Sequence, residues 1–217
     1  MWRVLSGMDV ALRVIVAPNS AFAHIRDSDG GYFAWSVGIS MLASVLWSGS
    51  LALLDPALGY WEAVARYVGM DLLTATVFAA VIYLVGRRLG GNGMWRTVFS
   101  AVFYTSVLAL LAFALFAVLT LLAGGISVWA FLVDADQWDF ESLEAGEPSG
   151  DMTYGPLGLL LGYLAVFIVG AIAFAVWTVV VLVKAVKTVN GFGTAKAFGI
   201  IVLALAVSAV VAAPFSM

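Results

Sequence analysis

The chain has 217 residues, of which 64% are hydrophobic and only 11% are charged, and its net charge is −3. A soluble domain averages about half apolar and about a quarter charged residues, so this composition indicates an integral membrane protein. The absence of cysteine excludes a disulfide framework, a thiolate metal site and a cysteine nucleophile.

The N-terminal segment (1–30) carries charges throughout, so we predict that it lies in the cytoplasm and does not cross the membrane. On a helical wheel its apolar face consists of Val4, Leu5, Met8, Ala11, Leu12, Ile15 and Val16. Pro18 then stops or restarts the helix. We expect an amphipathic helix that lies on the cytoplasmic leaflet or packs beneath the bundle as a brace, and the two arrangements are compatible.

Five apolar runs follow, each with about the 20 residues that a spanning helix needs. We place the transmembrane helices at about 32–54, 67–86, 97–125, 156–183 and 196–214. The third run reads as one long helix that breaks or ends near Gly124 and Gly125. Pro56, Pro156 and Pro214 lie at span ends, so no span shows an obvious mid-membrane break. The predicted fold is all-α: a polytopic membrane protein with a five-span transmembrane domain (31–217) and an N-terminal amphipathic interfacial helix.

Lysine and arginine are segregated along the chain. With five spans and the N-terminus inside, every Lys and Arg except Arg66 falls on the inner side. We therefore predict a protein integral to the plasma membrane, with a cytoplasmic N-terminus and an external C-terminus. The acidic outer loop (134–152) has no basic residue and is predicted to be solvated; its Asp134-Ala135-Asp136 start is only a weak match to a calcium loop.

The two predicted inner turns, 87–96 and 187–196, have similar sequences, each with Gly-x-Gly between basic residues. A shift of 100 residues superposes Gly91 on Gly191 and Gly93 on Gly193. One interpretation is an internal duplication, in which spans two and three repeat as spans four and five. The other, which we favour, is independent turn chemistry, because glycine ends helices and basic residues are wanted on the inner side.

Several stretches carry a family resemblance: the segment 15–25, the basic glycine-rich turn 88–93, the motif Tyr104-Thr105-Ser106, and the stretches 177–184 and 193–197 around the last turn. In these the chain resembles a short, prokaryotic-like member of the YIP-domain family, membrane proteins named for interaction with Ypt/Rab GTPases. The resemblance implies five spans, a cytoplasmic N-terminus and no known catalytic residues. It assigns no functional residue to this chain.

The basic residues of the inner turns form a candidate surface for anionic lipid headgroups or for a cytoplasmic protein partner. Its members are Arg87, Arg88, Arg96, Lys184, Lys187 and Lys196. The alternative is that these charges only determine topology, which requires no ligand.

Two further features lie inside the predicted spans. Asp71 is an ionisable residue in span two and a candidate ion or proton site, although its place near the outer end also fits an interfacial or structural role. Gly158 and Gly162 share one face of span four, where they allow close helix packing within the chain or between copies.

Catalysis has little support in the sequence. His24 is the single histidine, no Gly-x-Ser-x-Gly motif occurs, and we expect no metal, cofactor or nucleic-acid partner. We therefore predict a non-enzymatic protein of the lipid bilayer that organises the membrane or recruits a partner through its cytoplasmic face, with self-association as a further option. The alternative is a small-solute or ion permease or channel that uses Asp71.

Overall fold

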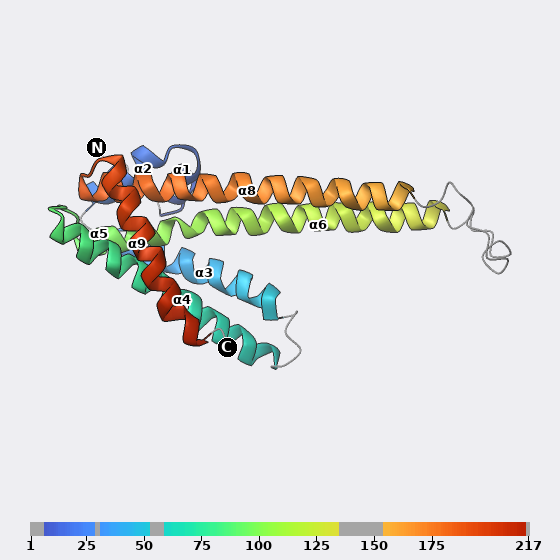
Figure 1. Cartoon of the computed structure of the whole chain (residues 1–217), viewed down its shortest axis with the longest axis horizontal. Coiled ribbons are helices and arrows are strands. Elements are labelled where there is room, and N and C mark those ends of the chain that lie inside the picture. The colour runs from blue at the N-terminus through green and yellow to red at the C-terminus, as the bar shows by residue number, and fades with distance from the viewer. Residues whose placement is uncertain (1–6, 29–30, 53–58, 135–153, 216–217) are drawn as a thin grey trace. The chain divides into compact units, whose positions relative to one another are not determined.

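Helices make up the regular structure in the parts of the chain that the computed structural model describes, which are residues 7–28, 31–52, 59–134 and 154–215. Side chains are described over the same ranges except for 122–163 and 215. In chain order the elements are α1 (Gly7–Val16), α2 (Pro18–Asp27), α3 (Phe33–Ala52), α4 (Tyr60–Arg88), α5 (Trp95–Tyr104), α6 (Ser106–Asp134), α8 (Tyr154–Asn190), α9 (Thr194–Ala212) and the 3-10 helix η2 (Ala213–Phe215) (Figure 1).

Five helical segments within the described ranges are long and apolar enough to cross a bilayer, which confirms the predicted all-α, five-span fold. They are Phe33–Ala52, Tyr60–Arg88, Trp95–Leu121, Leu164–Asn190 and Thr194–Ala212. Helix α4 begins at Tyr60, earlier than the predicted start at residue 67, because Glu62 and Arg66 interrupt the apolar run without interrupting the helix. Helix α8 likewise continues past the predicted end at residue 183.

The third span contains a turn at Thr105, which separates α5 from α6. The Thr105 N–H donates to the Val102 carbonyl, three residues back, at 3.0 Å, and the Thr105 hydroxyl donates to the same oxygen at 2.5 Å. A threonine hydroxyl bonded to the backbone in this way competes with the regular helical hydrogen bonds. Thr105 itself keeps a right-handed helical conformation, so Trp95–Leu121 remains one span with a local irregularity. Helix α6 continues through Gly124 and Gly125, where a break or end was expected.

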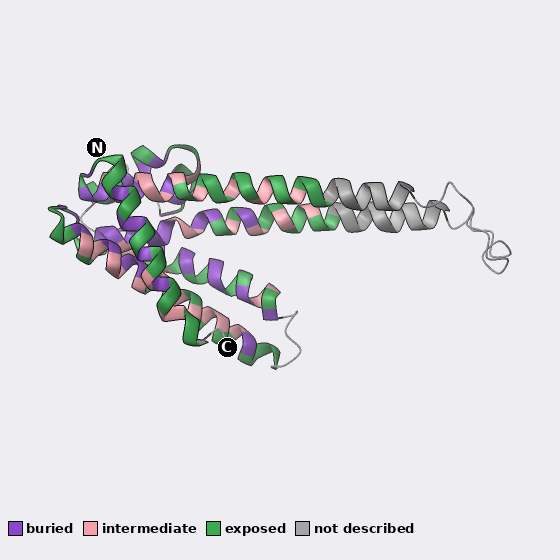
Figure 2. Ribbon diagram, in the orientation of Figure 1, coloured by how far each residue is buried: buried purple, intermediate pink, exposed green. Residues whose placement is uncertain are grey.

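The chain divides into two compact units, a larger one (Met1–Leu111 with Trp177–Met217) and a smaller one (Ala112–Val176). Within the larger unit α4 is central, because α3, α5 and α9 all pack against it. Figure 2 shows buried positions along these helices. Small and aliphatic residues occupy many of them, including the fully buried Ala79 and Ile82 of α4 and Ala204 of α9. Small residues let backbones approach closely, which matters in lipid because apolar surface alone gives little drive for association.

Helices α1 and α2 belong to the larger unit and dock on its spans. Helix α1 buries one face, which includes Gly7 and Val10, while Met8, Leu12 and Val16 on another face are 62%, 59% and 79% exposed. The docked face is held by a hydrogen bond of 3.4 Å from the Tyr104 hydroxyl to the Gly7 carbonyl. One face of α1 therefore serves as a brace, and a second apolar face is left for lipid.

The smaller unit contains α6 from Ala112 onward and α8 as far as Val176, and these two helical segments lie side by side (Figure 1). The rings of Phe116 and Phe167 pack with their centroids 4.6 Å apart. Large apolar side chains on both helices are exposed, among them Leu115, Val118 and Val169. In an integral membrane protein these surfaces face the acyl chains.

The docking of α1 yields a test based on Gly7. A methyl group at this position would come within 2.3–2.8 Å of three Trp35 atoms. We expect Gly7→Ala to loosen α1 at a cost of about 1–3 kcal/mol, because an overpacked contact must move apart. Hydrogen exchange of residues 7–28 in detergent should rise.

The matched control for this test is Gly38→Ala in α3, where a methyl group meets nothing within 4 Å. That change should leave exchange in 7–28 unaltered and stabilise the helix by about 0.5–1 kcal/mol. Equal exchange of α1 in both variants would contradict the docking described here.

Candidate functional site

Two helices of the larger unit end in the same hydrogen-bonded motif. After α4, the Gly91 N–H donates to the Gly86 carbonyl at 2.8 Å, and Gly90 adopts a φ of 87°. After α8, the Phe192 N–H donates to the Lys187 carbonyl at 3.1 Å, and Gly191 adopts a φ of 71°. Both are Schellman caps, in which a glycine with positive φ lets the chain reverse and satisfy the last carbonyls.

The structural counterpart of Gly191 is therefore Gly90, one residue away from the Gly91 that the sequence superposition pairs with it. The lengths of the turns also differ, since α5 is capped by Met94 and α9 by Gly193. The two turns end their helices with the same motif, but the turns differ in length. This difference favours independent turn chemistry over a repeated unit.

The two turns are locked together by the side chains of Asn190 and Phe192. Asn190 is 3% exposed, and its amide nitrogen donates to the Val186 carbonyl at 3.1 Å. A methyl group built at Gly91 would lie 2.8 Å from the Phe192 ring and 3.0 Å from the Asn190 Oδ1, so only glycine allows this approach. The Asn92 N–H also donates to the Asn190 carbonyl, at 3.4 Å.

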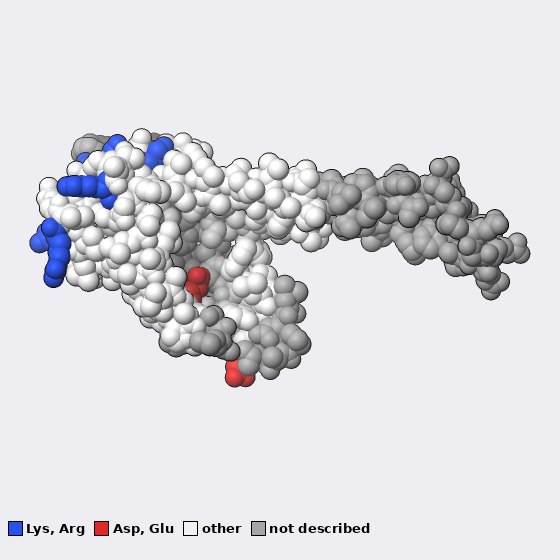
Figure 3. All heavy atoms as spheres, viewed as in Figure 1, with Lys and Arg blue, Asp and Glu red and all other residues white. Residues whose placement is uncertain are grey.

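The locked turns carry the predicted basic residues, so we call this end of the larger unit the basic end. Figure 3 shows Lys and Arg gathered there, over the α4–α5 turn, the α8–α9 turn and the neighbouring parts of α1 and α2. Arg87, Arg88, Arg96, Lys187 and Lys196 are exposed, and Lys184 is half-buried. None of these six side chains forms an ion pair with a described residue.

Aromatic rings position three of the six cations. The charged groups of Arg96, Lys184 and Lys196 lie 5.3, 5.7 and 5.7 Å from the ring centroids of Trp95, Trp177 and Phe192. Each such contact stabilises an exposed site by only about 0.5–1 kcal/mol, but it orients the side chain. Lys187 also donates to the Thr194 hydroxyl, at 3.4 Å.

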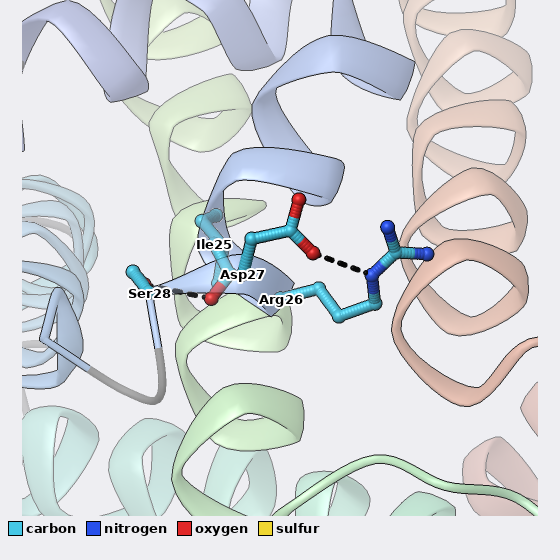
Figure 4. Close-up of polar contacts among 4 residues, drawn as sticks. All are labelled: Ile25, Arg26, Asp27 and Ser28. Carbon is cyan, nitrogen blue, oxygen red and sulfur yellow. Dashed lines mark hydrogen bonds and ion pairs between the residues drawn. The ribbon is translucent and has the colours of Figure 1, made fainter. Parts of the chain in front are cut away.

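Helix α2 contributes a separate polar contact at the basic end. The His24 Nε2 lies 2.8 Å from the Tyr32 hydroxyl, which ties α2 to the start of α3. Figure 4 shows the end of α2, where Arg26 Nε bonds Asp27 at 2.9 Å and the Ser28 hydroxyl donates to the Ile25 carbonyl. Because Arg26 has this acidic neighbour, it adds less net charge to the surface than Arg87 and Arg88 do.

Asp71 lies well inside α4, and the side chain of Ser44 from α3 bonds to it. The Ser44 hydroxyl donates to the Asp71 carboxylate at 2.5 Å. One helical turn along α3, Ser40 and Ser106 join α3 to α6 through a hydroxyl–hydroxyl contact of 3.2 Å. Within the described residues, no group of three His, Cys, Asp or Glu side chains is placed to hold a metal ion.

Two of the features expected from the sequence fall outside the described side chains. Gly158 and Gly162 lie in the first part of α8, where only the backbone is described. The acidic outer loop after Asp134 lies outside the described residues. Close packing through the glycines and a solvated loop therefore stay predictions.

A comparison with protein-family models identifies the family to which the chain belongs. The model described as the Yip1 domain matches residues 12–214, nearly the full chain. The chain belongs to the Yip1 domain family. The resemblance to YIP-domain proteins is confirmed, and the protein is an integral membrane protein. Searches of curated proteins and of solved structures found no match.

The structure of this Yip1-domain protein brings in residues that motif reasoning missed. Asn190 sits inside a turn noted only for its glycines and charges, and nothing local marks it as buried. Ser36, Ser40, Ser44 and Ser48 recur every four residues in α3 and are all buried, so their spacing was a visible signal for a polar helix face. The hydrogen bond from Ser44 to Asp71 required the structure.

The lock between the turns can be tested at Gly93. A methyl group there would lie 2.9 Å from the Asn190 Oδ1 and 3.0 Å from Val98. We expect Gly93→Ala to lower the free energy of unfolding by about 1–3 kcal/mol, because buried side chains must shift to admit it. Thermal unfolding followed by tryptophan fluorescence measures this.

Gly199→Ala, in the open face of α9, is the control, since a methyl group there meets nothing within 4 Å. It should be neutral or stabilising by about 0.5–1 kcal/mol. Equal midpoints for the two variants would show that the turns are not locked.

Proposed function

We propose that this Yip1-domain protein is a non-enzymatic membrane protein that organises the bilayer or recruits a protein partner through its basic end. The observation that carries the proposal is the clustering of six basic side chains on two interlocked turns. In this proposal the basic end faces the cytoplasm and the protein resides in the plasma membrane, with the C-terminus outside. The charge distribution supports this orientation through the positive-inside tendency.

Anionic lipid headgroups match the basic end in charge and position. Each Lys or Arg close to an anionic leaflet contributes about 1 kcal/mol of attraction. Arg87 and Arg88 are exposed and have no described acidic partner, so their charge is available. The exposed Met8, Leu12 and Val16 of α1 add an apolar stripe beside these charges, which is the composition of a membrane-interface helix.

The rigidity of the basic end separates this proposal from plain topology determination. Topology requires basic residues on one side but no fixed spacing among them. Here Schellman caps, the buried Asn190 and the aromatic contacts of Arg96 and Lys184 fix the spacing. A fixed pattern of charge loses less conformational entropy when it binds a headgroup or an acidic protein surface.

A second candidate function is passage of a small solute or ion along the spans. The observation that favours it is the bond between Ser44 of α3 and the exposed carboxylate of Asp71 of α4, within the spans. The two candidates use different parts of the molecule and can both hold.

The basic end can be tested with the variant Arg87→Gln/Arg88→Gln/Lys187→Gln. Three lost charges at about 1 kcal/mol each should weaken binding of phosphatidylglycerol by about 100-fold relative to the unchanged protein. Native mass spectrometry of the full chain in mild detergent, with phosphatidylglycerol and phosphatidylcholine in competition, measures the difference.

Arg66→Gln is the control, because Arg66 lies in the first part of α4, away from the basic end. Arg66→Gln should keep the preference for phosphatidylglycerol. The single change Arg88→Gln should weaken binding of phosphatidylglycerol about fivefold. Single introduced cysteines, labelled from one side, check orientation because the chain has none of its own. If the unchanged protein shows no preference for phosphatidylglycerol and holds no protein that the triple variant releases, the proposal fails.

A further inference from the structure

The carboxylate of Asp71 lies within the spanning helix α4, and its side chain is exposed at the surface of the larger unit. With a rise of 1.5 Å per residue, Asp71 is about 16 Å along α4 from Tyr60 and about 25 Å from Arg88. An ionised group at this depth is costly unless other groups compensate its charge.

The partner that the structure gives Asp71 is a neutral hydroxyl. Ser44 is 3% exposed, so it is held in the packed interface between α3 and α4 and donates its hydrogen to the carboxylate. One hydrogen bond from a neutral hydroxyl does not replace the full hydration of a carboxylate. The carboxylate therefore lacks a counter-charge among these contacts.

Among the described residues, no ion pair to Asp71 is formed. Helix α3 has no ionisable residue at all. Helices α5 and α9 bring Arg96, Tyr104 and Lys196, of which both cations lie at the basic end. On α4 itself the nearest ionisable residues are Glu62, Arg66 and Tyr67, toward Tyr60, and Tyr83, Arg87 and Arg88, toward the basic end.

A local irregularity in a neighbouring span lies close to the same region. Ser40, one turn from Ser44 on the same face of α3, contacts Ser106, the first residue after the turn at Thr105. Tyr104 and Leu108 on either side of this turn are fully buried, whereas Thr105 and Ser106 are half-buried. Irregular backbone at membrane depth occurs where protein buries it or where it lines a polar site.

Helix α9 brings another buried hydroxyl to this level. Ser208 is 3% exposed and has no hydrogen-bond partner in the structure. It lies on the buried face of α9, which packs along α4 (Figure 1). Gly86 of α4 lies against the turn before α9, so depth along both helices can be counted from this level. Ser208 is about 21 Å along α9 from Thr194, and Asp71 is about 22 Å along α4 from Gly86. The unpaired hydroxyl and the carboxylate are thus at matching depths.

We propose that Asp71 and Ser44 form an intramembrane site for one monovalent cation, either a proton or Na⁺. A single carboxylate that accepts a hydrogen bond from one neutral hydroxyl is balanced by one positive charge, whereas a divalent ion would leave an excess charge in the bilayer. Oxygen ligands of this kind suit Na⁺, and a proton neutralises the same carboxylate directly. The site is independent of lipid or partner binding at the basic end.

The test uses the full chain in lipid nanodiscs and dicyclohexylcarbodiimide, an apolar reagent that adds to carboxylic acids in membranes. The carboxylic acid adds across one C=N bond of the reagent without loss of atoms, so peptide mass spectrometry reads each labelled residue as a mass gain. We expect Asp71 to be labelled, Asp71→Asn to abolish that label, and Glu62→Gln to leave it unchanged.

The two cations give different results in this experiment. If Na⁺ but not choline slows labelling at constant pH several-fold and raises the unfolding temperature of the unchanged protein, the site binds Na⁺. If labelling slows several-fold with rising pH and Na⁺ has no effect, the site binds a proton. Labelling of Asp71 that responds to neither, or no label at Asp71, would overturn the proposal and leave a structural hydrogen bond.

The variant Ser44→Ala distinguishes cation binding from helix packing. It can be used as a test even if Asp71→Asn fails to fold. It removes the hydroxyl while Asp71 stays available for labelling. We expect the response of Asp71 labelling to Na⁺ or pH to shift several-fold. A lower unfolding temperature with an unchanged response would show that Ser44 only joins the helices, contrary to the proposed site.

Discussion

Close approach of two helix ends fixes the arrangement of the larger unit. Asn190 and Phe192 occupy the space that side chains at Gly86, Gly91 and Gly93 would fill, so the α4–α5 and α8–α9 turns meet almost backbone to backbone. In lipid, burial of apolar surface contributes little free energy to helix association, so tight packing must provide the driving force. The same contact sets the spacing of the charges around it, so stability and surface chemistry share one cause at this end.

Hydroxyl groups provide the second kind of helix–helix contact in this protein. The serine face of α3 turns inward along its full length and reaches α4 through Ser44 and α6 through Ser40. Small polar side chains of this sort permit close packing and add about 0.6–2 kcal/mol per hydrogen bond in a membrane. They also place oxygen atoms where an aliphatic face would have none, and so make a polar interior possible in a chain with very few charges.

Sequence patterns were sufficient to predict the spans but not the contacts between them. Apolar runs and the distribution of Lys and Arg follow from the bilayer itself, so the number and type of helices could be predicted. The start of α4 was missed because Glu62 and Arg66 lower the hydropathy of a segment that remains helical. The turn at Thr105 was missed because it has no proline, and Asn190 because its burial depends on glycines about 100 residues earlier in the chain.

Helix α8 has a consequence for the membrane around the protein. Its uncharged part ends at Val183 and, from Tyr154, is about 44 Å long, while a typical hydrocarbon layer is about 30 Å thick. A helix with this excess must tilt steeply, emerge from the layer, or thicken the lipid beside it. Each ångström of mismatch costs a fraction of a kcal/mol, so hydrophobic length alone makes this protein sensitive to bilayer thickness and favours its partition into thicker membranes.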